Sequence, residues 1–277
     1  MAWELTDSVE HFEATAGDFL RSRPVQHTVL LTLVDTLRRH GLQAYGEGSP
    51  VFGFWRTDGV VDGVLLQTPP RPMIFSEIPA EAVVPAVRAV AHLPLPGVNL
   101  LADAAEEFAG AWRERTGAGT SVSRRTRLYR LGALTSPVEP PPGRARVAGA
   151  GDRPLVTEWI GAMFDEIREE GDAAAITDDR LSYGGVTLWE DDGSPVSLAA
   201  RSRHHAGMIR VQTVYTPPAL RGRGYAAGAT TAVTREALAL GARDVVLNTD
   251  LTNPTSNRLY MRLGYRPVED RTVVEFS

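Results

Sequence analysis

The sequence predicts an α/β protein whose two halves repeat the same order of strands and helices. Strand patterns of period two alternate with helical patterns of period 3.6 along the chain. Each half holds one Asp-Gly pair between two strand patterns, which favours a tight β-hairpin because both residues tolerate a positive φ. A proline-rich segment, residues 137–143, is typical of a semi-rigid linker. We therefore expect one domain at residues 1–136 and a second at residues 144–277.

The first half is expected to begin with two helices, because apolar residues recur at helical spacing on either side of Pro24 and Gly41 follows the second pattern. Runs of β-branched and aromatic residues predict strands around Asp58-Gly59 and after it, and amphipathic segments predict two further helices. The expected helices are 7–21, 25–40, 79–92 and 101–116, and the expected strands are 51–56, 60–67, 72–76, 97–100 and 122–131.

The second half repeats the order of hairpin, third strand, long helix, short strand, second helix and last strand. Asp152 is expected to cap its first helix, and Gly241 and Gly264 follow the ends of two later ones. The expected helices are 152–169, 173–181, 224–240 and 254–263, and the expected strands are 146–150, 186–190, 195–203, 208–216, 244–248 and 272–276.

Composition narrows the classes of function. A formal net charge of −5 argues against a nucleic-acid partner. The chain has no cysteine and no lysine, so disulfides, thiolate or lysine nucleophiles and cysteine-bound metals are excluded. The N-terminus lacks the apolar core of a signal peptide, and no uncharged apolar run reaches the roughly 18 residues of a membrane span. We expect a cytoplasmic protein that does not contact membranes.

Residues 211–226 predict an anion-binding loop between a strand and a helix. The strand pattern stops at Pro217 and Pro218, which lack the N–H groups of a continuing ladder. Gly222 and Gly224 then allow the backbone to turn its N–H groups toward one point, where a helical pattern starts at Tyr225. Backbone N–H groups and the positive end of the helix dipole favour a phosphate at such a place.

Two common nucleotide motifs fit this loop poorly. Gly222 to Ala227 satisfies the dinucleotide fingerprint G-x-G-x-x-A, but two prolines separate it from its strand, and the next strand ends in Asn248 instead of an acid. A P-loop requires Gly-Lys, which this chain lacks. At the equivalent place the first half has Ser76-Glu77-Ile78-Pro79, with an acid and no glycine, so no diphosphate site is expected there.

Residues after the loop narrow the choice of ligand for this loop further. Arg221-x-x-Gly224-x-Ala226, followed by the segment from Asn253 to Tyr265 that contains Tyr260, resembles the GNAT superfamily of acetyl-CoA-dependent N-acetyltransferases. The resemblance covers residues 144–277, and residues 1–136 are similar to the degenerate partner half of tandem GNAT proteins of actinobacterial type. It implies two GNAT-like domains, each a mostly antiparallel mixed sheet that is splayed at its centre and flanked by helices. Only the second is expected to bind the cofactor.

The resemblance also implies roles for single residues. The main chain of Val214, Tyr215 and Thr216 would bind the pantetheine arm of acetyl-CoA, as would Asn253. Tyr260 would protonate the departing thiolate, and Glu166 would lie in the helix region that lines the acceptor cleft. The loop expected to hold the pyrophosphate comprises Arg221, Gly222, Arg223, Gly224, Tyr225 and Ala226.

These residue types suit acyl transfer. An amine that attacks a thioester generates an oxyanion and expels a thiolate whose thiol has a pKa of about 8.5 to 9. A neutral phenol with a pKa near 10 can lend that thiolate a hydrogen bond or a proton. Because acetyl-CoA is already an activated donor, transfer to a primary amine of a small molecule or peptide can be direct in a ternary complex. Neither a protein nucleophile nor a metal is needed.

The sequence leaves several assignments open. Residues 208–216 contain no acid. Glu166, Glu190 and Asp250 are candidate general bases, but the sequence favours a surface carboxylate for each of them. His204-His205 lies at an expected hairpin tip, where a solvated turn is favoured over a metal site. A non-catalytic acyl-CoA sensor and a transferase with another acyl donor are alternatives. A homodimer is also compatible with the sequence.

Overall fold

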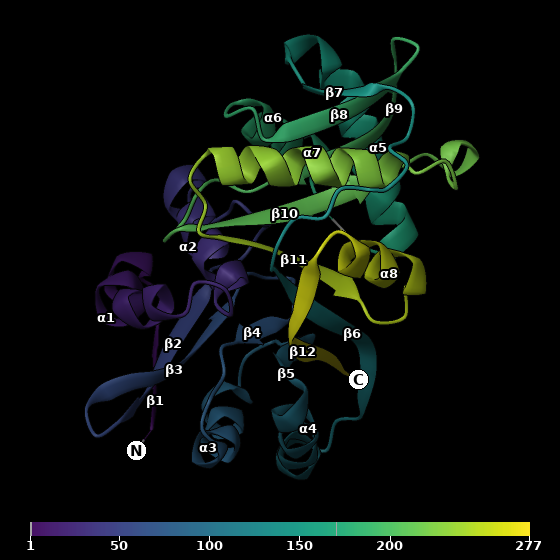
Figure 1. Cartoon of the computed structure of the whole chain (residues 1–277). Coiled ribbons are helices and arrows are strands. Elements are labelled where there is room, and N and C mark those ends of the chain that lie inside the picture. The colour runs from purple at the N-terminus through teal and green to yellow at the C-terminus, as the bar shows by residue number, and fades with distance from the viewer. Residues whose placement is uncertain (1, 170) are drawn as a thin grey trace. The chain divides into compact units, whose positions relative to one another are not determined.

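The computed structural model of the chain describes residues 2–169 and 171–277. These residues divide into two compact units. Unit 1 comprises the segment that ends at Leu128 together with Thr249–Thr252 and Val268–Ser277, and unit 2 comprises Tyr129–Asn248 and Asn253–Pro267. Three of the four divisions fall inside strands, β6, β11 and β12, and the fourth lies between β11 and α8 (Figure 1).

The sheet of unit 1 has the strand order β1-β2-β3-β4-β5-β12. Its paired strands are antiparallel except β4 and β5, which are parallel. The hairpin turns at Asp58 and Gly59, with φ of 50° and 82°, as the Asp-Gly pair predicts. The elements are β1 (Trp3–Thr6), α1 (Val9–Ser22), α2 (Thr28–His40), β2 (Val51–Thr57), β3 (Val60–Gln67), β4 (Met73–Phe75), α3 (Ala80–Val90), β5 (Gly97–Leu101), α4 (Ala102–Thr116), β6 (Thr120–Leu131) and β12 (Tyr265–Phe276).

Helices cover both faces of this sheet. Helices α1 and α2 pack apolar side chains such as Phe12 against Phe52 of β2, and α3 and α4 pack against the opposite face, where Phe108 meets Phe75 of β4. The two clusters follow from the alternation of strand side chains, since Phe75 and its neighbour Ile74 belong to different faces. Burying each large apolar side chain stabilises the fold by about 1.5–3 kcal/mol.

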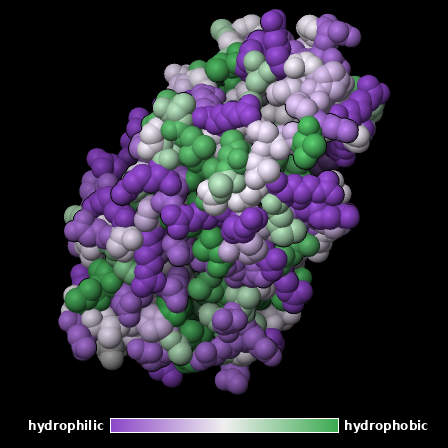
Figure 2. Space-filling view, in the orientation of Figure 1, coloured by the Kyte–Doolittle hydropathy of each residue, from purple (hydrophilic) through white to green (hydrophobic). Residues whose placement is uncertain are grey.

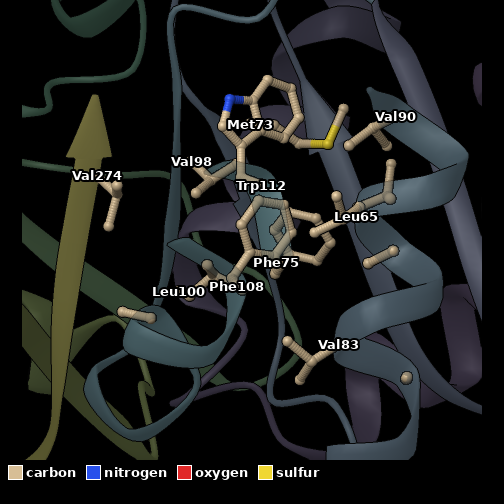
Figure 3. Packing of buried hydrophobic residues seen from close by; sticks show 14 of the residues in the cluster. Leu65, Met73, Phe75, Val83, Val90, Val98, Leu100, Phe108, Trp112 and Val274 are labelled. Atoms are coloured by element: carbon tan, nitrogen blue, oxygen red, sulfur yellow. The ribbon is translucent and has the colours of Figure 1, made fainter. Parts of the chain in front are cut away.

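The C-terminal strand β12 completes the core of unit 1. Its residues from Arg271 to Glu275 pair antiparallel with β5. Figure 3 shows Val274 on this strand beside the cluster that contains Val98 and Leu100, and the ring of Phe276 stacks on Trp112 with centroids 3.9 Å apart. The last residues of the chain are therefore part of the fold of the first unit.

Unit 2 has the strand order β11-β10-β9-β8-β7, again mostly antiparallel, with one parallel pair, β10 and β11. Helices α5 and α6 pack on the face that carries Leu198, and α7 and α8 pack on the face that carries Ala199. The elements are β7 (Arg144–Val147), α5 (Arg153–Ile167), α6 (Ala173–Leu181), β8 (Val186–Asp191), β9 (Ser194–Arg201), β10 (Met208–Tyr215), α7 (Tyr225–Ala239), β11 (Asp244–Asp250) and α8 (Pro254–Arg262).

Most elements lie within a few residues of where the sequence predicts them. Asp152 does not cap α5 as expected, because its carboxylate accepts instead from the N–H of Gly149 at 2.8 Å. Two strands also differ from the prediction. Strand β1 was not expected, because four residues with only two apolar side chains give no clear periodicity; pairing with β2 and burial of Trp3 stabilise it. Strand β12 starts at Tyr265 instead of 272, since Pro267 obscures a strand that runs through the division between the units.

The expected linker is packed against unit 2. Pro141 is buried, and the indole nitrogen Nε1 of Trp189 donates a hydrogen bond of 2.8 Å to the carbonyl oxygen of Pro142. A Cβ atom added at Gly143 would lie 1.9 Å from the carbonyl oxygen of Glu190, so only glycine fits there. The domain boundary at residues 137–143 stays a prediction. Contacts between Cα atoms divide the chain after Leu128, within β6.

The surface carries mixed chemistry. Hydrophilic residues dominate the face shown in Figure 2, with hydrophobic residues interspersed. None of the helices in the described ranges is long and apolar enough to cross a membrane.

His27 is a buried histidine immediately before α2. It is 1% exposed, its Nδ1 donates to the carbonyl oxygen of Leu20 at 3.1 Å, and its Nε2 has no partner within the described ranges. Burial lowers the pKa of His27 from its ordinary value; the Leu20 carbonyl opposes this shift, and the charges of Arg23 and Arg271 reinforce it. Below about pH 6.5 the unfolded chain therefore takes up a proton that folded unit 1 does not accept.

We predict that the free energy of unfolding of unit 1 falls as the pH drops below about 6.5, because His27 must be buried neutral. Chemical denaturation at pH 7.5 and at pH 5.5 measures this loss. It should be smaller in His27→Gln, which cannot titrate, and unchanged in the control His204→Gln, whose imidazole is exposed. An equal pH dependence in all three proteins would contradict the assignment.

Candidate active site

Strand β10 separates from β11 part-way along its length. The two strands pair in parallel only over Met208–Arg210, against Asp244–Val246. Beyond Arg210, β10 pairs only with β9, and its register shifts at a β-bulge between Gln212 and Val214, where Thr213 has a φ of 38°. The bulge bends β10. From Val211 to Tyr215, the edge of β10 opposite β9 pairs with no strand in the described part of the chain.

The main chain at the end of β10 alternates between the two sides. The carbonyl oxygen of Tyr215 accepts a hydrogen bond of 2.9 Å from Ser197 Oγ of β9, and the hydroxyl of Thr216 lies 2.9 Å from the same Oγ. The N–H and C=O of one residue point to the same side of a strand, and those of the next residue point to the other side. The N–H and C=O of Val214 therefore face away from β9, toward the open side. An extended ligand could add there as a further strand.

The loop after β10 presents a row of free backbone N–H groups. Gly222 and Gly224 both have a φ of 81°, a conformation that other residues rarely adopt, and α7 begins at Tyr225 directly after them. Among the residues that the structure describes, no protein atom accepts a hydrogen bond from the N–H groups of Gly222 through Ala226. Five consecutive donors at the start of a 15-residue helix make a site for a phosphate.

The side chains around this loop are not all free. Arg221 Nε donates to the carbonyl oxygen of Thr216 at 2.8 Å, and its Nη2 lies 2.6 and 2.8 Å from the two carboxylate oxygens of Glu166. The hydroxyl of Tyr225 donates to Asp191, and the side chain of Arg223 is exposed. The Tyr225 hydroxyl therefore joins the start of α7 to Asp191 at the end of β8.

Tyr260 lies in the hydrophobic cluster that also contains Val211 and Val214 of β10. It is 8% exposed, and its hydroxyl has no hydrogen-bond partner in the described ranges. Its ring meets Tyr265 edge to face, with centroids 6.2 Å apart. Burial raises the pKa of Tyr260 to about 12, so the phenol is protonated at neutral pH and can donate a proton or hydrogen bond.

A buried polar network lies beside Tyr260. The hydroxyl of Tyr129 donates to Asn257 Oδ1 at 2.8 Å, and Asn257 Nδ2 donates to the carbonyl oxygen of Asn253 at 2.7 Å. Asn253 caps α8, because its Oδ1 accepts from the N–H of Ser256 at 3.0 Å. The sequence did not single out Tyr129 or Asn257, although Asn257 stands three residues before Tyr260 on one helix, a spacing that places both on one face.

Residues 153–265 match a family model described as the acetyltransferase (GNAT) family. Residues 153–265 form a GNAT-family acetyltransferase domain. Proteins of this family transfer acyl groups, generally from acyl-CoA donors to amine acceptors. No curated protein sequence matches the chain.

Solved GNAT structures share the fold over most of the chain. A GNAT acetyltransferase from Colwellia psychrerythraea is 9% identical, with a TM-score of 0.64 over 100% of this chain and 99% of the other. A tandem GNAT protein from the clavulanic acid biosynthesis pathway is 13% identical, with a TM-score of 0.57 over 99% and 98%. A GCN5-related N-acetyltransferase from Kribbella flavida is 23% identical, with a TM-score of 0.57 over 77% and 86%. The predicted fold class is therefore confirmed.

The carboxylates considered as general bases of the GNAT domain have other partners. Glu190 pairs with Arg146 at 2.6 Å, and Glu166 pairs with Arg221. Asp250, which belongs to unit 1, accepts hydrogen bonds of 2.7 Å from the N–H and hydroxyl of Thr252. Within residues 2–169 and 171–277, no three acidic or histidine side chains are grouped to hold a metal ion.

Unit 1 contains the counterpart of the strand split, but a side chain fills it. Strands β4 and β5 pair in parallel through Ile74 and Asn99. At the next position of β4, Nη2 of Arg271 donates to the carbonyl oxygen of Phe75. The same Nη2 donates to the carbonyl oxygen of Asn99 at 3.1 Å, and Nε of Arg271 donates to Oδ1 of Asn99 at 2.9 Å. Arg271 is 9% exposed, and its Nη1 pairs with Glu269 at 3.2 Å. One guanidinium thus bridges both diverging strands.

Proposed function

We propose that unit 2 is an N-acetyltransferase that moves an acetyl group from acetyl-CoA directly to a primary amine of a small molecule or peptide. The observation that supports this most is the open side of β10 beside the free N–H groups of Gly222 through Ala226. An extended pantetheine arm can pair with the main chain of Val214, as a strand does, while the diphosphate accepts hydrogen bonds from the loop. Few other ligands combine a diphosphate with an extended amide-containing arm.

Tyr260 suits the role of proton donor. As the amine attacks the thioester, a C–N bond forms and the C–S bond breaks. The thiolate takes the proton of the Tyr260 hydroxyl, and the tyrosinate regains a proton from water. A phenol with a raised pKa stays protonated until the thiolate is expelled, and its hydroxyl is not engaged by the protein. Asn253 would bind the pantetheine arm through its Nδ2, since its Oδ1 already caps α8.

The amine must be neutral before it attacks, and β10 carries no acidic residue. We propose that the acceptor binds as the free base and that the proton lost from its nitrogen after attack passes to water. The main-chain N–H groups exposed on β10 stabilise the oxyanion. Direct transfer requires no covalent protein intermediate, which agrees with the lack of cysteine.

We propose further that unit 1 holds no acyl-CoA. Arg271 uses the carbonyl groups of Phe75 and Asn99 where β4 and β5 diverge, and Ser76 continues to pair with Val64 of β3 at 2.9 Å instead of opening into a loop. Glu77 follows and pairs with Arg23, and its negative charge disfavours a phosphate beside the start of α3. The cytoplasmic location and a homodimer stay predictions.

Replacing Tyr260 with phenylalanine should lower kcat by about 10²-fold and leave the affinity for acetyl-CoA unchanged, because only the proton donor is lost. Steady-state kinetics with a reacting amine and isothermal titration with CoA measure the two effects. Tyr265→Phe is the matched control, since Tyr265 touches Tyr260 but its hydroxyl bonds to Thr234. Equal turnover in Tyr260→Phe and wild type would remove Tyr260 from the chemistry.

Gly222→Ala should weaken CoA binding at least about tenfold, because alanine disfavours the left-handed backbone that aims the loop N–H groups. Gly241→Ala is the control at the other end of α7: its φ is 83° against 81° for Gly222, and an added Cβ meets nothing within 4 Å at either position. Both should lose about 1–2 kcal/mol of stability. Calorimetry that finds the same CoA affinity for both variants would place the diphosphate elsewhere.

Titration of the chain with CoA should give one site per chain, because the strand split of unit 1 is closed by Arg271. Calorimetric stoichiometry together with native mass spectrometry provides the measurement. Two bound CoA molecules per chain at saturation would show that unit 1 is also a cofactor-binding unit.

A further inference from the structure

Arg221 is held from two directions, although its place in the sequence suggests a free phosphate ligand. Its Nε donates to the carbonyl oxygen of Thr216 at the end of β10, and its Nη2 contacts both carboxylate oxygens of Glu166 near the end of α5. No contact within the described ranges involves its Nη1. A guanidinium is planar, so two contacts at one edge determine where the remaining N–H groups point.

Aromatic contacts join the same three segments. The Arg221 guanidinium lies 5.8 Å from the centroid of the Tyr215 ring, and that ring lies 6.1 Å from Trp159 of α5. Helix α5 therefore touches β10 through Trp159 and touches the loop through Glu166. The end of α5, the end of β10 and the start of the glycine loop are joined through one arginine side chain.

We propose that Glu166 is a positioning residue for the acyl donor: it orients Arg221 so that the free Nη1 edge meets the diphosphate. This inference rests on the proposed function and gives Glu166 a different role from those of general base and acceptor ligand. Both of its carboxylate oxygens already accept from Arg221, and its side chain is 40% exposed, a poor setting for a base that must receive a proton from a bound amine.

A competing arrangement has the opposite consequence. If the diphosphate displaced Glu166 from Arg221, the carboxylate would be a rival of the ligand, and its removal would strengthen binding. Because Nη1 is available without breaking either existing contact, the structure favours orientation over competition.

Two variants at Glu166 separate these roles. Glu166→Ala removes the acceptor of the Arg221 hydrogen bonds and should weaken CoA binding about three- to tenfold, the size expected for a partly exposed charged hydrogen bond. Glu166→Gln keeps an acceptor oxygen and should bind CoA within about twofold of wild type. Both variants should keep the wild-type kcat at saturating acetyl-CoA. Asp165→Ala, exposed and adjacent on α5, is the matched control and should change nothing.

The dependence on Arg221 is tested in a double-mutant cycle. In an Arg221→Ala background, Glu166→Ala should have no further effect on CoA affinity, because Glu166 acts only through that guanidinium. Tighter CoA binding by Glu166→Ala would support competition and overturn the proposal. A loss of kcat in both Glu166 variants with unchanged CoA affinity is the result expected for a general base, and it would also overturn the proposal. Additive effects of the two substitutions in the cycle would overturn it as well. Failure of the wild-type chain to bind CoA would overturn the proposed function as well.

Discussion

The separation of β10 from β11 is the constraint on which the candidate active site depends. Main-chain hydrogen bonds join the two strands over three residues of each and then stop, and the bulge at Thr213 turns β10 away. A strand edge inside a sheet is costly to leave unpaired, because buried N–H and C=O groups need partners. An extended ligand with amide groups would satisfy them, which is why we propose the open edge as the binding site.

The two units meet this demand in different ways. In unit 2 the strand leads into a loop with two glycines, where α7 starts and N–H groups stay free. In unit 1 the strand leads into Ser76 and Glu77, and the guanidinium of Arg271 bonds to both diverging strands. The C-terminal strand thus supplies from within the chain the hydrogen-bond donors of unit 1, whereas in our proposal a ligand pairs with the open strand of unit 2. Duplication of the fold need not duplicate the activity.

Much of the fold and part of the site could be predicted from the sequence. The Asp-Gly hairpins, the proline stop after β10 and Gly224 before α7 are local signals, because backbone conformation is decided by those few residues. The chain position of Arg271 gave no such signal, since its partners Phe75 and Asn99 are more than 170 residues away. The pairing of Glu166 with Arg221 is likewise a tertiary contact, 55 residues apart in sequence. Tyr129, whose hydroxyl donates to Asn257, lies in a strand with exposed arginines, so the sequence pattern does not indicate that it is buried.

Amide hydrogen exchange with and without CoA tests the central claim most directly. The account predicts that CoA slows exchange at Val214 and at Gly222 through Ala226, where N–H groups without protein partners acquire ligand acceptors, and leaves Phe75 and Asn99 of unit 1 unchanged. Saturating CoA binding with no slowing at Val214 and the glycine loop would contradict the account, because the ligand would then occupy some other part of the protein.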